Sequence, residues 1–391
     1  MAKIDVKLNY DDVTIVPEKV TTIKSRKECD PFVDSFHLPI FAAPMGSVVS
    51  EENIREFNNN HIKVVIPRKL PKNDRISHLG DYSSNFVAFS MDEARNIFVE
   101  NNEIKQYLME QKHESAIDHR NYVDLYPRKY KICIDVANGH MSKLIDLCKE
   151  IKSIWGDAVT IMTGNIANPE TYELYEEAGI DFCRVSIGSG SACTTATCTG
   201  VFYPIFSLIK EIYEIKKKIG GKCKIIADGN IKDYRDIQKA LIYADYVMIG
   251  GLFNKAIESA GKTTYGKSYW HIFGKKVVNP IRTLFTYGRE VHPDNYYKCL
   301  KRVKCGKLDI FKEHYGESTK KAQKVNGSCC DGKLKTSEGR VFKQLVEYGI
   351  KGWVENEIDY LRSSMSYTNS RNLEEYKESS WVRITEIKYN R

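Results

Sequence analysis

The chain has 391 residues, of which 42% are hydrophobic and 28% are charged, and these values fit a globular protein with a sizeable core. It contains no apolar run long enough to cross a bilayer, no signal-peptide core in residues 1–9, and no CxxC pair among its eleven cysteines, so we expect a cytoplasmic protein with reduced thiols and no membrane partner. The formal net charge of +8 predicts a mildly basic surface, with an anionic substrate or incidental nucleic-acid affinity as the alternatives.

Eight short apolar, β-branched runs alternate with helical patterns as far as residue 250. The expected strands are 39–43, 63–67, 85–89, 131–135, 158–163, 181–185, 224–228 and 246–250. The expected helices include 142–154, one opened by Pro169, and 233–243. Alternating strands and helices imply a parallel sheet with right-handed crossovers, and eight repeats fit a closed (β/α)8 TIM barrel. An open doubly wound sheet is the competing architecture.

Polar and glycine residues stand where several of these strands end. They are Asp135, the segment 163–165, Asp228 with Gly229, and the pair Gly250 and Gly251. Barrel enzymes carry their chemistry at the carboxyl ends of the strands. Glycine pairs let backbone N–H groups approach a phosphate closely. The pattern therefore predicts an active site at this end of the barrel.

Beyond residue 262 the alternation stops. We interpret 265–312, which is aromatic and basic, as an irregular insertion beside the top of the barrel, and 313–340 as a flap segment whose polar part, 320–335, is mobile. No nucleic-acid motif with defined spacing accompanies the lysines of 298–335, so nucleic acid is not the favoured partner. A helix at 354–361 and a closing strand at 381–387 complete a single catalytic domain spanning 1–391.

Cys193 lies on the loop after the sixth expected strand, within Gly188-Ser-Gly-Ser-Ala-Cys-Thr-Thr195. Such a loop bends sharply, presents several N–H groups to a phosphate, and turns carbonyls toward a cation. A cysteine placed there attacks an electron-poor carbon when nearby donors favour its thiolate. The alternative interpretation is that Cys193 is an ordinary loop cysteine without a catalytic role.

Several ordered motifs set this loop in a wider context. They are Leu8-Asn-Tyr-Asp-Asp-Val-Thr-Ile-Val-Pro17, Ala43-Pro-Met45, Asp135-Val-Ala-Asn-Gly-His140, Thr163-Gly-Asn165, Arg184-Val-Ser-Ile-Gly-Ser-Gly-Ser-Ala-Cys-Thr-Thr195, Asp228-Gly229, Met248-Ile-Gly-Gly251, Tyr315-Gly-Glu-Ser318, Ser337-Glu-Gly339 and Leu361-Arg-Ser-Ser-Met-Ser-Tyr367. Together they resemble the IMP dehydrogenase/GMP reductase family, and more closely its reductase branch. Only about 265–312 lies outside the resemblance.

The resemblance implies a role for each matching residue. Cys193 would attack carbon 2 of the purine, while Thr195 and Glu338 would manage the proton that makes ammonia a leaving group. Substrate-binding positions would be Met45, Ser191, Asp228, Gly229, Gly250, Gly251, Gly316 and Ser318. Cofactor-side positions would be Asp135, Asn138 and Ser337, and the carbonyls of Gly188, Gly190 and Cys193 would bind a monovalent cation such as potassium. The family also implies a homotetramer.

Three features favour GMP reductase, which converts GMP to IMP and ammonia with NADPH, over IMP dehydrogenase, which converts IMP to XMP with NAD. The segments Asp135-Val-Ala-Asn-Gly139 and Gly250-Gly251 look more like the reductase versions. About 60 residues separate Pro67 from Lys131, which leaves no room for the regulatory CBS-domain pair of most dehydrogenases. The segment 315–339 contains no Arg-Tyr pair to support hydrolysis of the adduct. By contrast, the segments Gly188-Ser-Gly-Ser191 and Glu338-Gly-Arg-Val341 resemble those of dehydrogenases. A binding protein that uses 265–312 to contact nucleic acid is a third alternative.

The chain departs from the family pattern at several positions. Gly46 replaces an aspartate of the family pattern, and Ala196 replaces an arginine. Asn230 replaces a glycine, and Glu317 replaces an apolar residue. Lys335 lies near a position that is often arginine. An additional carboxylate at Glu317, beside the base, would favour a purine edge rich in donors. These departures keep a divergent enzyme acting on a related purine nucleotide among the alternatives.

Overall fold

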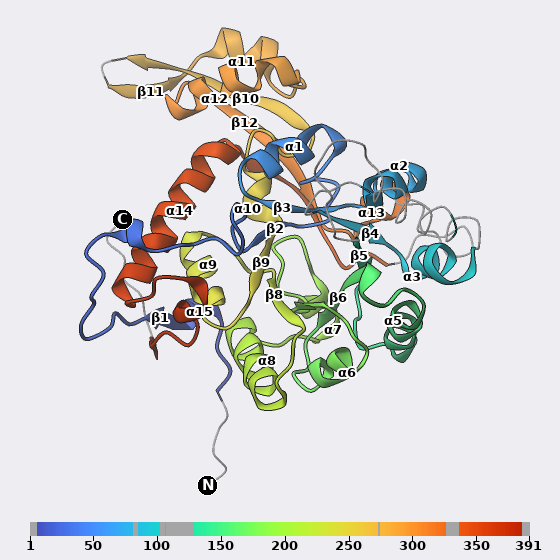
Figure 1. Ribbon diagram of the computed structural model, residues 1–391. Coiled ribbons are helices and arrows are strands. Elements are labelled where there is room, and N and C mark those ends of the chain that lie inside the picture. Colours follow the sequence, from blue (N-terminus) through green and yellow to red (C-terminus); the bar gives the residue numbers. More distant parts are fainter. Residues whose placement is uncertain are drawn as a thin grey trace, which may run out of the picture.

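The computed structural model describes residues 6–80, 85–101, 106, 129–272, 274–325 and 336–384. These residues form a closed barrel, a four-stranded antiparallel sheet and a two-stranded ribbon. Figure 1 shows the barrel with its surrounding helices and, above it, the antiparallel sheet that projects away from it.

Eight parallel strands close the barrel. They are β2 (Ile40–Ala42), β3 (Lys63–Ile66), β4 (Phe86–Phe89), β5 (Tyr130–Asp135), β6 (Val159–Ile166), β7 (Phe182–Val185), β8 (Lys224–Asp228) and β9 (Tyr246–Ile249). The ladder closes because β9 pairs with β2, with Ile40 opposite Val247. Each strand overlaps its predicted run, so the (β/α)8 barrel is confirmed and the open doubly wound sheet is excluded.

Large apolar side chains fill the interior of the barrel. The ring of Phe41, on β2, lies 5.7 Å from Phe86, 6.2 Å from Phe182 and 5.0 Å from Tyr246, measured between centroids. Met162, Ile226 and Met248 belong to the same buried cluster. The interior is therefore a packed core, and the space for a substrate lies beyond the strand ends.

Helices cover the outside of the barrel. They are α1 (Glu51–Asn59), α2 (Lys72–Ser77), α3 (Met91–Arg95), α5 (Ser142–Trp155), α6 (Thr171–Glu177), α8 (Ile205–Ile219), α9 (Tyr234–Leu241), α10 (Gly251–Asn254) and α14 (Ile350–Tyr367). The predicted apolar stripe of α5 is buried, including Leu144, Leu147 and Ile151. Pro169 lies just before α6, and its carbonyl accepts the Tyr172 N–H at 3.1 Å.

The segment predicted as an irregular insertion is instead regular. The accessory sheet, as we name it, has the order β11 (Lys275–Val278), β10 (Thr263–Ile272), β12 (Leu308–Tyr315) and β13 (Val341–Leu345). Helices α11 (Pro280–Thr286) and α12 (Tyr296–Lys304) connect β11 to β12. The accessory sheet and these helices have a small hydrophobic core of their own, which includes Ile257, Leu300 and Ile310. Because β12 and β13 flank the expected flap, the sheet fixes where the described ends of that segment lie, with Gly316 and Gly339 beside Ala192.

The first and last strands form the ribbon. Antiparallel pairing joins β1 (Val13–Ile15) to β14 (Trp381–Arg383), and α15 (Leu373–Tyr376) precedes β14. The predicted closing strand is thus confirmed for 381–383, whereas 385–387 lie outside the described residues. Of the predicted flap, α13 (Lys320–Val325) is helical, and 326–335, with Cys329, Cys330 and Lys335, are likewise outside them. No described helix has the length and apolar character needed to cross a membrane.

Candidate functional site

The loop that carries Cys193 follows β7 and returns into the short helix α7 (Thr195–Thr199). Gly188 has a φ of +76°, and a Cβ at this position would lie 2.9 Å from the Cβ of Ala196. Glycine is therefore required here by both backbone conformation and space. The Cys193 N–H donates to the Gly190 carbonyl at 2.9 Å, which closes the turn in front of the nucleophile candidate.

A chain of two hydrogen bonds runs from the thiol of Cys193 to a carboxylate. The thiol donates to Thr195 Oγ1 at 3.2 Å, and Thr195 Oγ1 donates to Glu338 Oε2 at 2.7 Å. All three side chains are partly accessible to solvent. The arrangement offers a path for a proton between the sulfur and the carboxylate.

A short ladder holds Glu338 beside the cysteine loop. The Thr194 N–H donates to the Glu338 carbonyl at 2.8 Å, and the Arg340 N–H donates to the Ala192 carbonyl at 3.0 Å. Cys193 and Gly339 form an antiparallel bridge between these bonds. The Arg340 guanidinium also donates to the Ser191 carbonyl, at 2.8 and 3.0 Å. Sequence reasoning assigned no role to Arg340, because nothing in the sequence pairs 338–340 with 191–194.

The predicted substrate-binding glycines pack tightly around the same loop. A Cβ on Gly229 would lie 2.7 Å from Ser189 Oγ, and one on Gly251 would lie 2.6 Å from Ser191 Oγ. A Cβ on Gly250 would lie 2.6 Å from Met45 Sδ. These contacts bring the ends of β2, β8 and β9 together with the cysteine loop.

The loop after β12 closes the other side of the cysteine loop. A Cβ on Gly316 would lie 3.1 Å from the Ala192 carbonyl oxygen. Ser318 Oγ lies 3.0 Å from the position of a Cβ on Gly339. The structure therefore assembles the predicted substrate positions from four strand ends and this loop.

Arg184 is a charged residue that sequence reasoning left without a role. It lies at the end of β7, is buried, and donates from Nη1 to Asp135 Oδ1 at 2.7 Å and from Nε to Asp228 Oδ2 at 3.0 Å. Asn165 Nδ2 donates to the same Asp228 oxygen at 2.8 Å. The guanidinium thus fixes both carboxylates at the barrel mouth.

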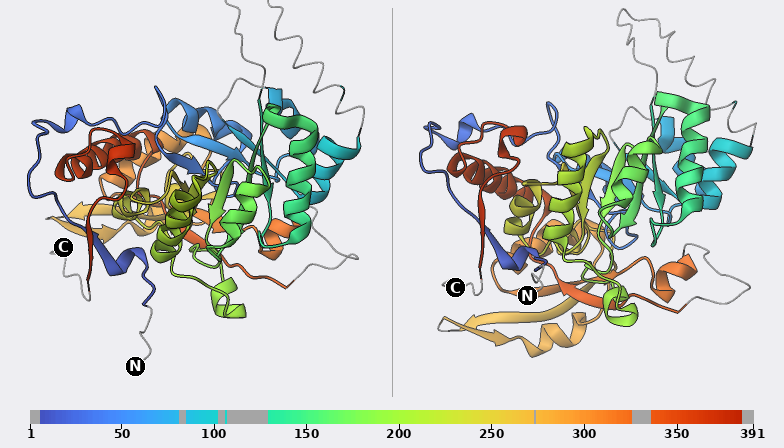
Figure 2. Two further views of the ribbon diagram at one scale, coloured as in Figure 1. Left: turned by 60° about the horizontal axis from the view of Figure 1, so that its bottom comes forward. Right: turned by 90° about the horizontal axis from the view of Figure 1, so that it is seen from below.

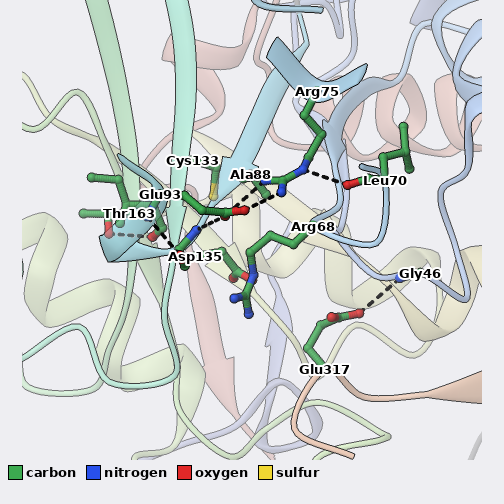
Figure 3. A network of polar contacts seen from close by, with 12 residues as sticks. Gly46, Arg68, Leu70, Arg75, Ala88, Glu93, Cys133, Asp135, Thr163 and Glu317 are labelled. Atoms are coloured by element: carbon green, nitrogen blue, oxygen red, sulfur yellow. Dashed lines mark hydrogen bonds and ion pairs between the residues drawn. The ribbon is translucent and has the colours of Figure 1, made fainter. Parts of the chain in front are cut away.

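Asp135 has a second cationic neighbour. Arg68, which follows β3, places Nε 3.4 Å from Asp135 Oδ2, and Figure 3 shows its side chain between Asp135 and Glu317. Burial by itself raises the pKa of Asp135, but Arg184 and Arg68 together hold it below the ordinary aspartate value. Asp135 is consequently ionised at neutral pH.

The other two predicted cofactor positions make local contacts. Asn138 is exposed and its Oδ1 accepts the His140 N–H at 3.0 Å. Ser337 Oγ donates to the Gly339 carbonyl at 2.8 Å. Neither of these hydrogen bonds joins Asn138 or Ser337 to Asp135.

Gly46 and Glu317, two residues at which the chain departs from the family pattern, are in direct contact. The Gly46 N–H donates to Glu317 Oε1 at 3.1 Å, as Figure 3 shows, and Lys69 Nζ donates to the Gly46 carbonyl at 3.3 Å. A Cβ on Gly46 would lie 2.7 Å from Lys69 Cδ and 3.1 Å from Tyr315 OH. The carboxylate at 317 therefore reaches the end of β2 from the opposite side of the site.

His314 is a further buried group beside the site. Its Nδ1 lies 3.1 Å from Ser47 Oγ, and its Nε2 lies 3.5 Å from the position of a Cβ on Gly251. Burial lowers the pKa of His314 to about 4. The imidazole is therefore neutral at pH 7, and no sequence signal marked it.

The carbonyls proposed for a monovalent cation lie on one tight turn. The Gly190 carbonyl accepts the Cys193 N–H at 2.9 Å and retains a second lone pair. The described residues contain no group of three or more His, Cys, Asp or Glu side chains suited to a metal ion. Any cation at this loop would thus be held by backbone oxygens.

Comparison with known proteins places the geometry in a family. A model described as "IMP dehydrogenase / GMP reductase domain" matches residues 7–390. The GMP reductase of Buchnera aphidicola subsp. Schizaphis graminum is 28% identical over 98% of this chain and 95% of the relative. That of Caenorhabditis elegans is 26% identical over 97% of this chain and 92% of the relative. That of Staphylococcus aureus (strain JH9) is 31% identical over 68% of this chain and 77% of the relative.

Proposed function

We propose that this chain, which belongs to the IMP dehydrogenase/GMP reductase family and is an oxidoreductase of purine metabolism, is a GMP reductase. It would convert GMP to IMP and ammonia with NADPH, through a covalent bond between Cys193 and carbon 2 of the purine. The observation that carries the proposal is the hydrogen-bonded relay from Cys193 through Thr195 to Glu338. A relay of this kind serves a reaction in which an amine must leave with a proton.

The first half of the reaction follows from the direction of these hydrogen bonds. Cys193 passes its proton through Thr195 to Glu338, and the thiolate attacks carbon 2 of GMP. The proton returns through Thr195 to the 2-amino nitrogen, the bond from carbon 2 to that nitrogen breaks, and ammonia leaves. The Cys193–purine adduct remains.

The second half reduces the adduct. When bound, NADPH would supply the hydride that replaces sulfur at carbon 2, so that the carbon–sulfur bond breaks and IMP and NADP⁺ form. Cys193 departs as a thiolate and regains a proton from solvent. Asp135, held ionised by Arg184 and Arg68, is assigned to the cofactor side together with Asn138 and Ser337.

Substrate binding is assigned to the groups packed around the cysteine loop. Asp228, oriented by Arg184 and Asn165, accepts the ribose hydroxyls. The backbone at Gly229, Gly250 and Gly251, with Ser191, binds the phosphate. The proposal extends to a potassium ion on the carbonyls of Gly188, Gly190 and Cys193, to a single catalytic domain without a CBS pair, and to a cytoplasmic homotetramer.

A four-way assay tests the proposed function. Purified protein is incubated with GMP or IMP and with NADPH or NAD, and cofactor absorbance, ammonia and nucleotide products are measured. We expect turnover with GMP and NADPH, with one ammonia and one IMP formed per NADPH consumed. XMP formed from IMP and NAD, without turnover of GMP, would assign the chain to the dehydrogenase branch instead.

Two cysteine variants separate the nucleophile from general thiol chemistry. Cys193→Ala should abolish turnover and the covalent adduct seen by mass spectrometry of the denatured enzyme. Cys198→Ala removes an exposed thiol five residues away and should leave both unchanged. Turnover that survives Cys193→Ala would refute the covalent mechanism.

A further inference from the structure

The basic charge of the chain is concentrated in one part of the accessory sheet. The stretch 263–308, from the start of β10 to the start of β12, contains ten Lys and Arg but only two Asp and Glu, a formal net charge of +8. The whole chain, with 59 basic and 51 acidic residues, also carries +8. The remainder is therefore neutral overall, and the projecting sheet accounts for the excess.

Helix α11 presents large apolar side chains to solvent. Ile281 is 65% exposed, Leu284 80% and Phe285 62%. Thr283 lies on the opposite face, where its Oγ1 accepts the Ser268 N–H of β10 at 3.1 Å. Because residues i, i+3 and i+4 share one face of a helix, these three side chains form a stripe directed away from the sheet.

The neighbouring hairpin β10–β11 has an apolar face as well. Trp270 pairs directly with Val277, and Ile272 with Lys275, so these side chains share one face of the two strands. Trp270, Ile272 and Val277 are each exposed. We call the hairpin and α11 together the tip; it carries the exposed basic residues Lys267, Lys275, Lys276 and Arg282.

The tip is a projection of the molecule. In Figures 1 and 2 the hairpin and α11 extend beyond the barrel and its helices. A projection that combines exposed aliphatic side chains with a basic rim matches a flat, anionic, partly apolar surface.

We propose that the tip docks the protein onto an anionic lipid membrane. The lysines and arginine contact phosphate and carboxylate headgroups, while the α11 stripe and Trp270 enter the boundary between headgroups and acyl chains. The aliphatic Ile281 and Leu284 favour lipid over single-stranded nucleic acid, whose bases stack on aromatic rings. Contact between two tips is disfavoured because each brings four net positive charges, from Lys267, Lys275, Lys276 and Arg282. The inference is independent of the reaction assigned to the barrel.

Vesicle flotation of the full-length protein tests this inference. The vesicles contain phosphatidylcholine alone, or phosphatidylcholine with 30% phosphatidylserine, at low and at high salt. We expect flotation only with phosphatidylserine, reduced at high salt. Replacing Lys275 by Glu should weaken binding at least about fivefold, since one lysine near such a surface contributes about that factor. The matched control Lys351→Glu, an exposed lysine on α14, should change it less than twofold.

The apolar contribution is tested separately. Leu284→Ser with Phe285→Ser should reduce flotation more than about tenfold, because two large apolar side chains lose their burial in lipid. Leu174→Ser, which removes an exposed leucine on α6, is the matched control and should leave flotation unchanged. Thermal unfolding confirms that each variant is folded.

Three outcomes would overturn the inference. The first is equal flotation, or none, with both vesicle types. The second is salt-sensitive binding of an oligonucleotide that the tip variants abolish while flotation persists unchanged. The third is dissociation of an oligomer, seen by analytical ultracentrifugation, when Leu284 and Phe285 are replaced, which would assign the tip to contact with a second copy of the chain.

Discussion

Thr195 and Glu338 lie 143 positions apart in the chain, and a hydrogen bond of 2.7 Å joins the hydroxyl of one to the carboxylate of the other. We expect Glu338→Gln to lower kcat for GMP by about 10²-fold or more, since general acid–base groups contribute about 10²–10⁴-fold. The amide keeps the size of the side chain and its ability to accept the Thr195 hydrogen bond, but it cannot hold the proton. NADPH consumption and ammonia release measure the effect.

Two variants of Thr195 test the role of its hydroxyl. Thr195→Ser retains the donor and should keep kcat within about tenfold of wild type, whereas Thr195→Val removes it and should resemble Glu338→Gln. If the two single losses act on one relay, Thr195→Val combined with Glu338→Gln should be little worse than either alone. Multiplied losses in the double variant would mean that the two residues act independently.

Arg184 gives a prediction about stability and its pH dependence. Arg184→Met leaves Asp135 and Asp228 without their shared cation, and breaking a buried ion pair costs about 3–5 kcal/mol. Arg184 depresses the pKa of Asp135, so its stabilising effect is present above the ordinary aspartate pKa and is lost as the pH falls below it. The deficit in thermal unfolding midpoint should therefore be largest near pH 7 and smaller near pH 4.

The conservative variant Arg184→Lys checks that this effect arises from charge. It keeps one positive charge at the site but loses the fork that reaches both carboxylates, so an intermediate midpoint is expected. A deficit in Arg184→Met that is the same at pH 7 and pH 4 would instead indicate a loss of packing.

The sequence predicted the barrel well because its strands are short apolar runs separated by amphipathic helices, and this period is visible locally. It did not predict the accessory sheet. The strand β10 mixes Gly266, Lys267 and aromatic residues without alternation, and its partner β12 begins 45 positions later, at Leu308. Pairing of this kind is set by tertiary contacts that the local pattern does not contain.

In the site, too, some residues were predicted from the sequence and others were found only in the structure. Cys193, Thr195 and Glu338 were predicted through the family resemblance, and the structure brings them into contact. Arg184 begins the family motif that contains Cys193, but its role depends on its contacts with Asp135 and Asp228. Only the closed barrel brings these two carboxylates to Arg184. Arg340 was missed for a similar reason, since only folding places it against Ser191.

The contact between Gly46 and Glu317 leads to a prediction about coupled positions. Gly46→Asp places a second carboxylate against Glu317 and pushes on Lys69, so we expect it to raise KM for GMP about tenfold. Adding Glu317→Met removes the like charge and restores the residue classes that the family uses at both positions. The double variant should recover most of the affinity.

A double-mutant cycle on KM measures this coupling. We expect an interaction energy of about 1–2 kcal/mol between the two sites, within the range for residues in contact. Additive effects would show that the two departures are independent. A pairing of Gly46→Asp with Lys351→Met, far along the chain on α14, supplies a reference in which additivity is expected.

Lys312, on β12, is an ionisable residue buried at the base of the accessory sheet. It is fully buried, its Nζ donates to the Ser259 carbonyl, and the ammonium lies 4.7 Å from the centroid of the Tyr296 ring. Burial lowers the pKa of Lys312 from 10.5 to about 7, although nearby Glu258 raises it. Since the folded protein releases this proton more readily than the unfolded chain, Lys312 makes the folded state more stable as the pH rises from about 7 toward 10.5.

The stability of Lys312→Met relative to wild type should therefore be most favourable at pH 7 and should fall as the pH rises. One group that titrates between these limits changes the difference by about 1.4 kcal/mol per pH unit at most. Thermal unfolding at pH 7, 8 and 9 measures the trend, and Lys351→Met, at an exposed lysine, should show no comparable dependence on pH. A difference between Lys312→Met and wild type that stays constant from pH 7 to pH 9 would show that Lys312 is not the titrating group, because the sign and slope follow directly from its lowered pKa.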